Sequence, residues 1–368
     1  MHIETLLGIR LPIIQAPMAS VQGSALALAV SRAGAMGSLP CAMLSRQALH
    51  DELSLLRAQG PGAGAGLGAF NLNFFCHTPP PPDAGRERAW RSALAPYAAE
   101  LGIDFSTVPA GPGRLPFSAD VAELLDEFKP PILSFHFGLP APALLQRVRR
   151  WGAKILSTAT TVEEGRWLQA QGADAVIAQG LEAGGHRGLF LSDDLSTQLG
   201  TLALVPQLVA ALDIPVIAAG GIATAQGVAA ALQLGAAAVQ VGTAYLLCPE
   251  ATTSAVHRAA LKSPGVHLTA LTSLFTGRPA RGIVNRLMRE LGAVDGAGLA
   301  ARVFPHFPLV SAALAPLRAE AERRGSGDFS PLWAGQNSQG CKEISATALT
   351  RELARGLAST GRPLLPAA

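Results

Sequence analysis

Residues 214–249 read IPVIAAGGIATAQGVAAALQLGAAAVQVGTAYLLCP and contain no charged side chain. A membrane span is the first interpretation that so long an uncharged stretch invites. Gly220, Gly221, Gly235 and Gly242 interrupt it, however, and it divides into a β-branched run, an Ala-rich run with two glutamines, and a second β-branched run. This order predicts strand, helix and strand, as in parallel sheets that are covered on both faces. The stretch therefore favours a soluble α/β protein.

The same alternation extends over most of the chain. Helical patterns at residues 23–34, 144–152, 161–172 and 224–235 each end on a glycine suited to a left-handed C-cap. Alternating strands and helices predict a parallel sheet, and eight strands predict closure into a (β/α)8 TIM barrel. An open doubly wound sheet would need fewer strands and an early G-x-G-x-x-G turn, which the sequence lacks. The eight expected strands are residues 12–18, 35–40, 66–74, 131–138, 153–159, 174–180, 215–221 and 237–243.

Two segments interrupt this alternation. Residues 77–128 begin with a proline run, continue into weakly patterned helical sequence, and are expected to be an insertion after the third strand. Residues 246–368 are mainly helical with loops, and we expect them to supply the last barrel helix and a lid or a separate small domain. Residues 1–245 are then the barrel core.

Composition restricts the function classes. Of the 368 residues 49% are apolar and 15% are charged, which is enough apolar material for a large core. The net charge is +3 without basic runs, so nothing indicates binding to nucleic acid or to a membrane surface, and small molecules are the expected partners. The N-terminus lacks the pattern of a secretory signal, so a cytoplasmic location is expected. Four widely spaced cysteines give no zinc or disulfide pattern: Cys41, Cys76, Cys248 and Cys341.

In a barrel of this kind, function resides at the carboxyl ends of the strands. Two glycine-containing loops, AAGGIAT (218–224) and QVGTAY (240–245), follow the seventh and eighth expected strands. Their backbone N–H groups can point into one concavity, and this pair of loops is the usual phosphate-binding site of such barrels. The alternative is that Gly220 and Gly221 serve only a tight turn. Together the two loops favour phosphate.

A histidine follows the sixth expected strand, in AQGLEAGGHRG (178–188). Gly184 and Gly185 allow the backbone to approach a ligand closely, and His186 can accept or donate a proton near neutral pH. A histidine in isolation is more often a structural residue. Its position at a strand end next to two glycines favours a catalytic role.

Six segments carry a resemblance to a known family. They are PIIQAPMA (12–19), FNLNFFCHTPP (70–80), SFHFGLP (134–140), AQGLEAGGHRG (178–188), PVIAAGGIA (215–223) and VQVGTAYL (239–246). In this order they resemble the class I nitronate monooxygenases. The first and last two recur in related FMN barrels, including NADH:quinone reductases and flavin-type enoyl-acyl-carrier-protein reductases. The other three point more narrowly to the nitronate enzymes.

The resemblance implies an FMN-dependent oxidoreductase that oxidises alkyl nitronates, such as propionate 3-nitronate, with O2. The products are a carbonyl compound and nitrite, and the reaction passes through a flavosemiquinone. His186 would be the base or the group that orients the substrate. The implied FMN-binding residues are Ala16, Pro17, Met18, Asn71, Gln179, Gly184, Gly185, Gly220, Gly221, Gln240, Val241, Gly242 and Thr243. The implied substrate-pocket residues are His136, His77, Trp333 and Gln336.

Several alternatives remain open at this point. Met18 can equally be core packing, and Trp333 and Gln336 can belong to a surface lid. Three histidines can bind zinc, but a phosphate site leaves little room for it, so no metal is expected. Glu182 could orient the His186 ring or face solvent. The competing functions are an NADH-dependent FMN reductase and a non-catalytic flavin-binding protein, and the chain could be a monomer or a homodimer.

Overall fold

The computed structural model describes residues 2–60, 68–105, 108, 114–292 and 304–360, and it contains a barrel of eight parallel strands. The hydrogen-bonded order is β1-β9-β8-β6-β5-β4-β3-β2, and a parallel bridge between Ile14 and Met36 joins the first and last members. The predicted (β/α)8 barrel is confirmed. The strands are β1 (Ile13–Gln15), β2 (Gly37–Pro40), β3 (Phe70–Phe75), β4 (Ile132–His136), β5 (Lys154–Ala159), β6 (Ala175–Gln179), β8 (Val216–Ala219) and β9 (Ala238–Val241).

Both faces of the barrel strands are buried, which explains why their sequences read as continuous apolar runs. On β6, Ile177 points into the barrel, where it packs with Ile14 and Ile217. The next residue, Ala178, points outward and packs under the surrounding helices. Helix α1 (Ile3–Leu7) adds two buried apolar side chains to the cluster inside the barrel. The amino end of the barrel is therefore a packed core and not an opening.

In the part of the chain that the structure describes, eight helices surround these strands, and four of them end as predicted. Gly34, Gly152, Gly172 and Gly235 have φ angles of 94°, 88°, 84° and 96°, in the region that favours glycine. The last barrel helix arrives more than 100 residues after β9 and packs between α2 and α9. The helices are α2 (Ser24–Arg32), α3 (Arg46–Gln59), α5 (Ala119–Phe128), α6 (Pro142–Arg149), α7 (Val162–Ala170), α8 (Thr201–Ala211), α9 (Ala225–Gln233) and α14 (Ala346–Ala354).

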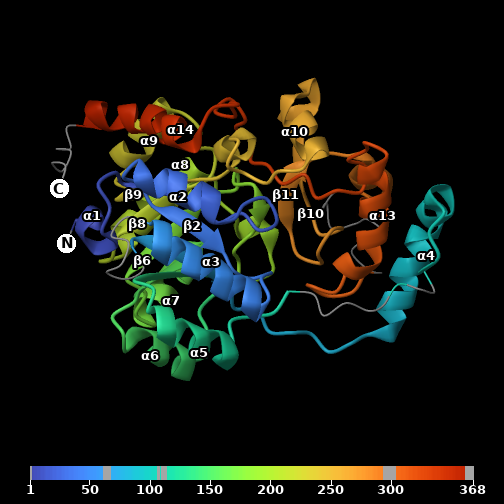
Figure 1. Ribbon diagram of the computed structural model, residues 1–368, viewed down its shortest axis with the longest axis horizontal. Helices are drawn as coiled ribbons and strands as arrows, with labels where there is room; N and C mark the ends of the chain where they lie inside the picture. Colours follow the sequence, from blue (N-terminus) through green and yellow to red (C-terminus); the bar gives the residue numbers. More distant parts are fainter. Residues whose placement is uncertain (1, 61–67, 106–107, 109–113, 293–303, 361–368) are drawn as a thin grey trace.

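A second unit stands beside the mouth of the barrel (Figure 1). It combines α4 (Ala84–Leu101), from the expected insertion, with α10 (Ala255–Lys262), α11 (Arg286–Leu291) and α13 (Ser311–Arg323). Helices α4 and α13 pack together, and Trp90 Nε1 donates a hydrogen bond to the carbonyl oxygen of Val310 at 3.2 Å. Helix α5, at the end of the expected insertion, lies between α3 and α6 as a regular barrel helix. The division of the chain at residue 245 stays a prediction.

The second unit also contains a small antiparallel sheet that the sequence did not lead us to expect. Strand β11 (Ala280–Ile283) pairs with β10 (Thr269–Thr272) on one side and with the two-residue β7 (Gly185–His186) on the other. In this register Ala280 lies opposite His186. The loop that carries His186 is therefore hydrogen-bonded to the second unit.

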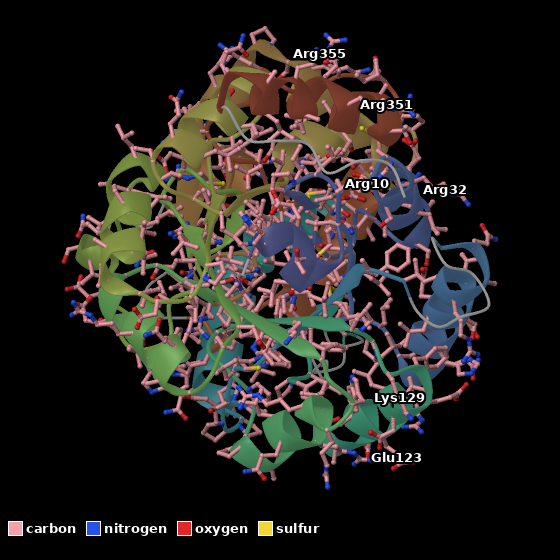
Figure 2. The ribbon with its side chains drawn as sticks, turned by 90° about the vertical axis from the view of Figure 1, so that its left-hand side faces the viewer. Arg10, Arg32, Glu123, Lys129, Arg351 and Arg355 are labelled. Atoms are coloured by element: carbon pink, nitrogen blue, oxygen red, sulfur yellow. The ribbon has the colours of Figure 1, made fainter. Side chains whose placement is uncertain are left out.

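Charged side chains gather on the outside of the barrel. Figure 2 views the barrel end away from the second unit, with Glu123 and Lys129 on one rim and Arg351 and Arg355 on the opposite rim. Each helix in the described part of the chain is too short or too polar to cross a bilayer. The uncharged stretch at 214–249 forms β8, α9 and β9, as predicted.

Candidate active site

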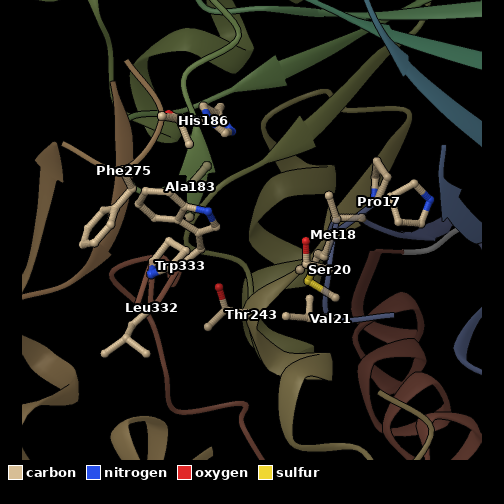
Figure 3. Close-up of a pocket in the computed structure, with 18 of the residues that line it drawn as sticks. Pro17, Met18, Ser20, Val21, Ala183, His186, Thr243, Phe275, Leu332 and Trp333 are labelled. Carbon is tan, nitrogen blue, oxygen red and sulfur yellow. Dashed lines mark hydrogen bonds between the residues drawn. The ribbon is translucent and has the colours of Figure 1, made fainter. Parts of the chain in front are cut away.

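A cavity of about 700 Å³ lies at the carboxyl ends of the barrel strands and extends to the second unit. The parallel register places Gln179 beside Ala219 and Ala219 beside Gln240, so three strands end at one level. Figure 3 shows His186, Phe275 and Trp333 on one side of the cavity and Pro17, Met18 and Val21 on the other. The predicted site residues that line it are Ala16, Pro17, Met18, His136, Gln179, Gly184, Gly185, His186, Gly220, Gly221, Gln240, Gly242, Thr243 and Trp333.

Four predicted site residues do not line this cavity. Asn71 lies deeper in the barrel, where its Nδ2 donates to Ser38 Oγ at 2.9 Å and its Oδ1 has no partner. Asn73, two residues further along the same face of β3, does line the cavity. Val241 faces outward and packs under the barrel helices. Gln336 is exposed, although its neighbour on the chain, Gly335, lines the cavity.

His77, the fourth, lies behind the cavity wall. Its Nε2 is 3.1 Å from the carbonyl oxygen of Arg114, and its ring packs edge-on against Phe307 with 4.8 Å between centroids. Burial, opposed by the bond to Arg114, lowers the pKa of His77 to about 4. A neutral ring at this place supports the aromatic wall and carries no charge into the site at neutral pH.

His186 stands at the centre of an aromatic enclosure. The ring centroids of Phe75, Phe137, Phe307 and Trp333 lie 6.1, 6.0, 5.5 and 5.8 Å from its own. Burial holds the pKa of His186 well below its usual 6.5, and the charges of Arg114 and Arg278 lower it further. The imidazole is therefore neutral at neutral pH, which is the form that can accept a proton.

The backbone at His186 is fixed by two side chains from the barrel. Gln179 Nε2 donates to the carbonyl oxygen of His186 at 2.8 Å, and Gln179 Oε1 accepts from the N–H of Gly188 at 2.8 Å. His136 Nε2 lies 3.3 Å from the same carbonyl, and its Nδ1 lies 3.0 Å from Thr158 Oγ1. Because burial lowers the pKa of His136 to about 3, it is neutral, so Nε2–H donates and Nδ1 accepts from the hydroxyl. These contacts make His136 a supporting group for the loop.

Arg187, the neighbour of His186, is fully buried, although nothing in the surrounding sequence predicts this. Its guanidinium donates to the carbonyl oxygens of Gly180 and Gln179, at 2.7 and 2.8 Å, and to Gln198 Oε1 at 3.0 Å. A buried cation with three oxygen acceptors orders the chain around it. Arg187 and Gln179 thus both hold the loop after β6 through hydrogen bonds.

The glycines predicted to bind phosphate lie at the cavity. Gly220 and Gly221 have φ angles of 119° and 69°, and both line the cavity together with Gly242. Gln240 Oε1 is buried without a hydrogen-bond partner, which leaves an acceptor for a ligand. Thr243 Oγ1 accepts from the N–H of Gly335 at 2.9 Å. The Thr243 hydroxyl thus binds the segment that carries Trp333.

Glu182 neither orients the His186 ring nor simply faces solvent. Its carboxylate accepts from the N–H of Thr201 at 2.8 and 3.0 Å and from Thr201 Oγ1 at 2.8 Å, at the start of α8. A carboxylate at this position satisfies free N–H groups and suits the positive end of the helix. The backbone at Gly184 packs closely against Ala334 and Gly335. A Cβ at Gly184 would lie only 2.6 Å from their backbone atoms, so the position needs glycine.

Two arginine side chains lie against the aromatic enclosure. The guanidinium carbon of Arg278 lies 4.1 Å from the ring centroid of Phe137, and that of Arg114 lies 5.9 Å from Phe307. Arg114 lines the cavity, and its Nε is buried without a partner. Neither arginine was found from the sequence. Within the part of the chain that the structure describes, no group of histidine, cysteine and acidic side chains is arranged to hold a metal ion.

Comparisons with known proteins point to one family. The family model for nitronate monooxygenase matches residues 2–356. The nitronate monooxygenase of Pseudomonas aeruginosa is 43% identical over 96% of this chain and 97% of its own, and that of Paraburkholderia phytofirmans is 39% identical over 96% and 93%.

Solved structures give the same result. A nitroalkane oxidase from Streptomyces ansochromogenes superposes with a TM-score of 0.85, at 38% identity over 97% of this chain and 98% of that one. FabK from Thermotoga maritima, at 24% identity and a TM-score of 0.71 over 97% and 96%, shares the fold. Family match, relatives and barrel together show that this chain, an oxidoreductase, belongs to the nitronate monooxygenase family.

Proposed function

We propose that the chain is an FMN-dependent enzyme that oxidises alkyl nitronates with O2 to a carbonyl compound and nitrite. The observation that carries the proposal is the position of His186, a neutral imidazole on the wall of the cavity with Arg114 and Arg278 nearby. A nitronate is an anion, so positive charge favours its binding. Positive charge also favours its formation from a neutral nitroalkane, because negative charge develops on the nitro oxygens as the proton leaves.

The residues present fit FMN. The backbone at Gly220, Gly221 and Gly242 offers a cradle for the phosphate, and the unpartnered Gln240 Oε1 can accept a hydrogen bond from a hydroxyl of the ribityl chain. Met18, whose sulfur lies on the cavity wall across from Trp333, gives the ring an apolar contact. FMN, when bound, supplies the acceptor for the electrons of the nitronate and the reactivity with O2.

The chain itself supplies binding, orientation and proton transfer. His186 takes the proton from the carbon next to a nitro group, or donates a hydrogen bond to a nitronate that is already ionised. Phe75, Phe137 and Phe307 exclude water around this ring, which strengthens the field of the two arginines. The hydrogen bonds of Gln179 and Arg187 hold the loop, so the imidazole is already in position before the substrate binds.

The proposal is tested by oxygen uptake of the purified, FMN-saturated protein on addition of propyl 1-nitronate or propionate 3-nitronate, with NADH absent. We expect rapid uptake together with nitrite release. The parallel experiment adds NADH under anaerobic conditions and follows the absorbance of the flavin. Bleaching by NADH without uptake on nitronate would show a reductase and would refute the proposal. A protein that binds FMN but does neither would be a flavin-binding protein without this activity.

A further inference from the structure

Thr276 contacts the ring of His186 from the second unit. It lies in the connection between β10 and β11, is 1% exposed, and places its Oγ1 2.9 Å from His186 Nε2. The antiparallel pairing of β11 with β7 brings this connection to the ring. The two residues are 90 positions apart in the sequence, and the pairing is what joins them.

The neighbouring atoms indicate to which acceptor the Thr276 hydroxyl donates its proton. Its oxygen lies 3.3 Å from the carbonyl oxygen of Arg278, to which it can donate, and 3.5 Å from the N–H of Arg278, from which it can accept. A hydroxyl has one proton to donate. If it donates to the carbonyl, the proton between Thr276 and His186 must come from Nε2. If it donates to Nε2 instead, the partly buried carbonyl of Arg278 loses this donor, which favours the first arrangement.

The second ring nitrogen of His186, Nδ1, has different surroundings from Nε2. Among the described residues, Nδ1 of His186 has no hydrogen-bond partner. It is also not among the unpartnered polar atoms that are completely shielded from solvent. The half-buried His186 lines the cavity, so Nδ1 is the ring nitrogen available to a ligand. In a neutral imidazole, one nitrogen carries the proton and the other a lone pair, and the hydrogen bond of one fixes the state of both.

We propose that Thr276 is a positioning residue that fixes the Nε2–H tautomer of His186 and so makes Nδ1 the atom that accepts the substrate proton. The tautomer follows from the contacts alone, while its use as a base rests on the proposed function. In the reaction of a neutral nitroalkane, the proton of the α carbon moves to Nδ1. The electron pair of the broken C–H bond forms the C=N bond of the nitronate, and the negative charge moves to the nitro oxygens.

Thr276 keeps the same contact on both sides of this step. The imidazolium still donates from Nε2 to Oγ1, and Oγ1 still donates to the carbonyl of Arg278. Without the hydroxyl, Nε2–H would be buried without an acceptor, and the ring could take the other tautomer or turn over. The arrangement follows the rule that a catalytic histidine is oriented by the hydrogen bond of its second nitrogen.

The test compares Thr276→Val, which keeps the shape and removes the hydroxyl, with Thr276→Ser, which keeps the hydroxyl. The first readout is the ¹⁵N-histidine spectrum of the FMN-loaded protein, in which His186 is assigned by the signals lost in His186→Asn. We expect a protonated Nε2 and an unprotonated Nδ1 in the parent and in Thr276→Ser, and a changed or mixed state in Thr276→Val. A protonated Nδ1 in the parent, or an unchanged spectrum in Thr276→Val, would overturn the proposal.

The second readout is kcat/KM for a neutral nitroalkane. We expect a loss of about tenfold or more in Thr276→Val and a value within about threefold of the parent in Thr276→Ser. Equal losses in both variants would mean that bulk, and not the hydroxyl, is required, which would also overturn the proposal. A protein that shows the expected tautomer but consumes no nitronate would instead refute the proposed function, so the two failures are distinguishable.

Discussion

Gln179 holds the carbonyl oxygen of His186 at 2.8 Å through its side-chain N–H. The same amide accepts from Gly188 N–H at 2.8 Å, so a single side chain fixes the backbone on both sides of Arg187. Gln179 belongs to a barrel strand, whereas His186 belongs to a loop paired with the second unit. The contact therefore ties the candidate base to the barrel. One N–H and one lone pair of Gln179 remain for a ligand.

Replacing Gln179 by leucine should test this positioning role in protein that is saturated with FMN. Leucine has a similar size but neither donor nor acceptor, so the loop loses both contacts. We expect Gln179→Leu to lower kcat with a nitronate about tenfold or more because His186 is misplaced. The free energy of unfolding should fall by about 1–3 kcal/mol, since buried backbone groups lose their partners.

The matched control is Gln207→Leu, because Gln207 makes only an exposed contact on α8. Steady-state kinetics and urea unfolding of both variants give the comparison. Full turnover in Gln179→Leu would show that the contact has no role in catalysis.

Gly242 offers a test of the phosphate cradle that does not disturb the fold. Its φ of −113° is accessible to any residue, and an added Cβ would lie 3.4 Å from Ala16 Cβ and 3.6 Å from Met18 Sδ, which are ordinary contacts. The methyl group would, however, occupy space next to the backbone N–H that we assign to the phosphate. We expect Gly242→Ala to raise the Kd for FMN about tenfold or more, with the Tm of the FMN-free protein within about 2 °C of the parent.

Titration of the flavin-free protein with FMN measures the first quantity, and a thermal scan without FMN measures the second. Riboflavin, which lacks the phosphate, is the control ligand. Its affinity should change much less than that of FMN, and an equal loss for both would place the phosphate elsewhere.

His186→Asn should distinguish a base from an orienting group. Asparagine retains a hydrogen-bond donor but cannot accept a proton from carbon at neutral pH. We expect kcat/KM for a neutral nitroalkane to fall by about 10²-fold or more, and that for a nitronate to fall by less, because a nitronate needs no deprotonation. In the parent, the rate with the neutral substrate should stay constant from about pH 8 to 6.5, since the pKa of His186 lies well below 6.5. Equal losses on both substrates would show that His186 only orients.

The barrel could be predicted because its physical causes are local in the sequence. Strands buried on both faces are continuous apolar runs, and helices that end in a left-handed residue end on glycine, as at Gly34 and Gly235. The glycine turn after β8 could be predicted for the same reason, since positive φ angles at Gly220 and Gly221 need glycine. Asn71 and Asn73 share one face of β3, and sequence could not show which of the two reaches the cavity.

The remaining part of the site depends on contacts between distant segments. Strand β7 has two residues, too few for any periodicity, and it exists because β11 pairs with it. Thr276 reaches His186 through that pairing, and nothing around Thr276 in the sequence marks it. Arg187 looks like an exposed loop residue, and its burial becomes clear only with the carbonyl oxygens of Gly180 and Gln179 placed around it.

Buried histidines should make the protein less stable in mild acid. Burial lowers the pKa of His257 to about 4 and that of His136 to about 3, whereas both have ordinary values near 6.5 in the unfolded chain. Below pH 6.5 the unfolded chain therefore binds more protons than the native protein, and the free energy of unfolding decreases as the pH falls. Each such group contributes a slope of at most about 1.4 kcal/mol per pH unit, between pH 6.5 and its native pKa.

His257→Asn should reduce this slope. The bond between His257 and the backbone of Trp333 uses Nδ1, because Nε2 has no partner, and the amide of asparagine can occupy the Nδ1 position. We expect urea unfolding at about pH 7, 6 and 5 to show a smaller loss of stability in the variant, by up to about 1.4 kcal/mol per pH unit. His2→Asn, at an exposed position, is the control and should keep the slope of the parent. An unchanged slope in His257→Asn would mean that His257 becomes protonated in the native protein, with Glu322 as the nearby carboxylate that permits it.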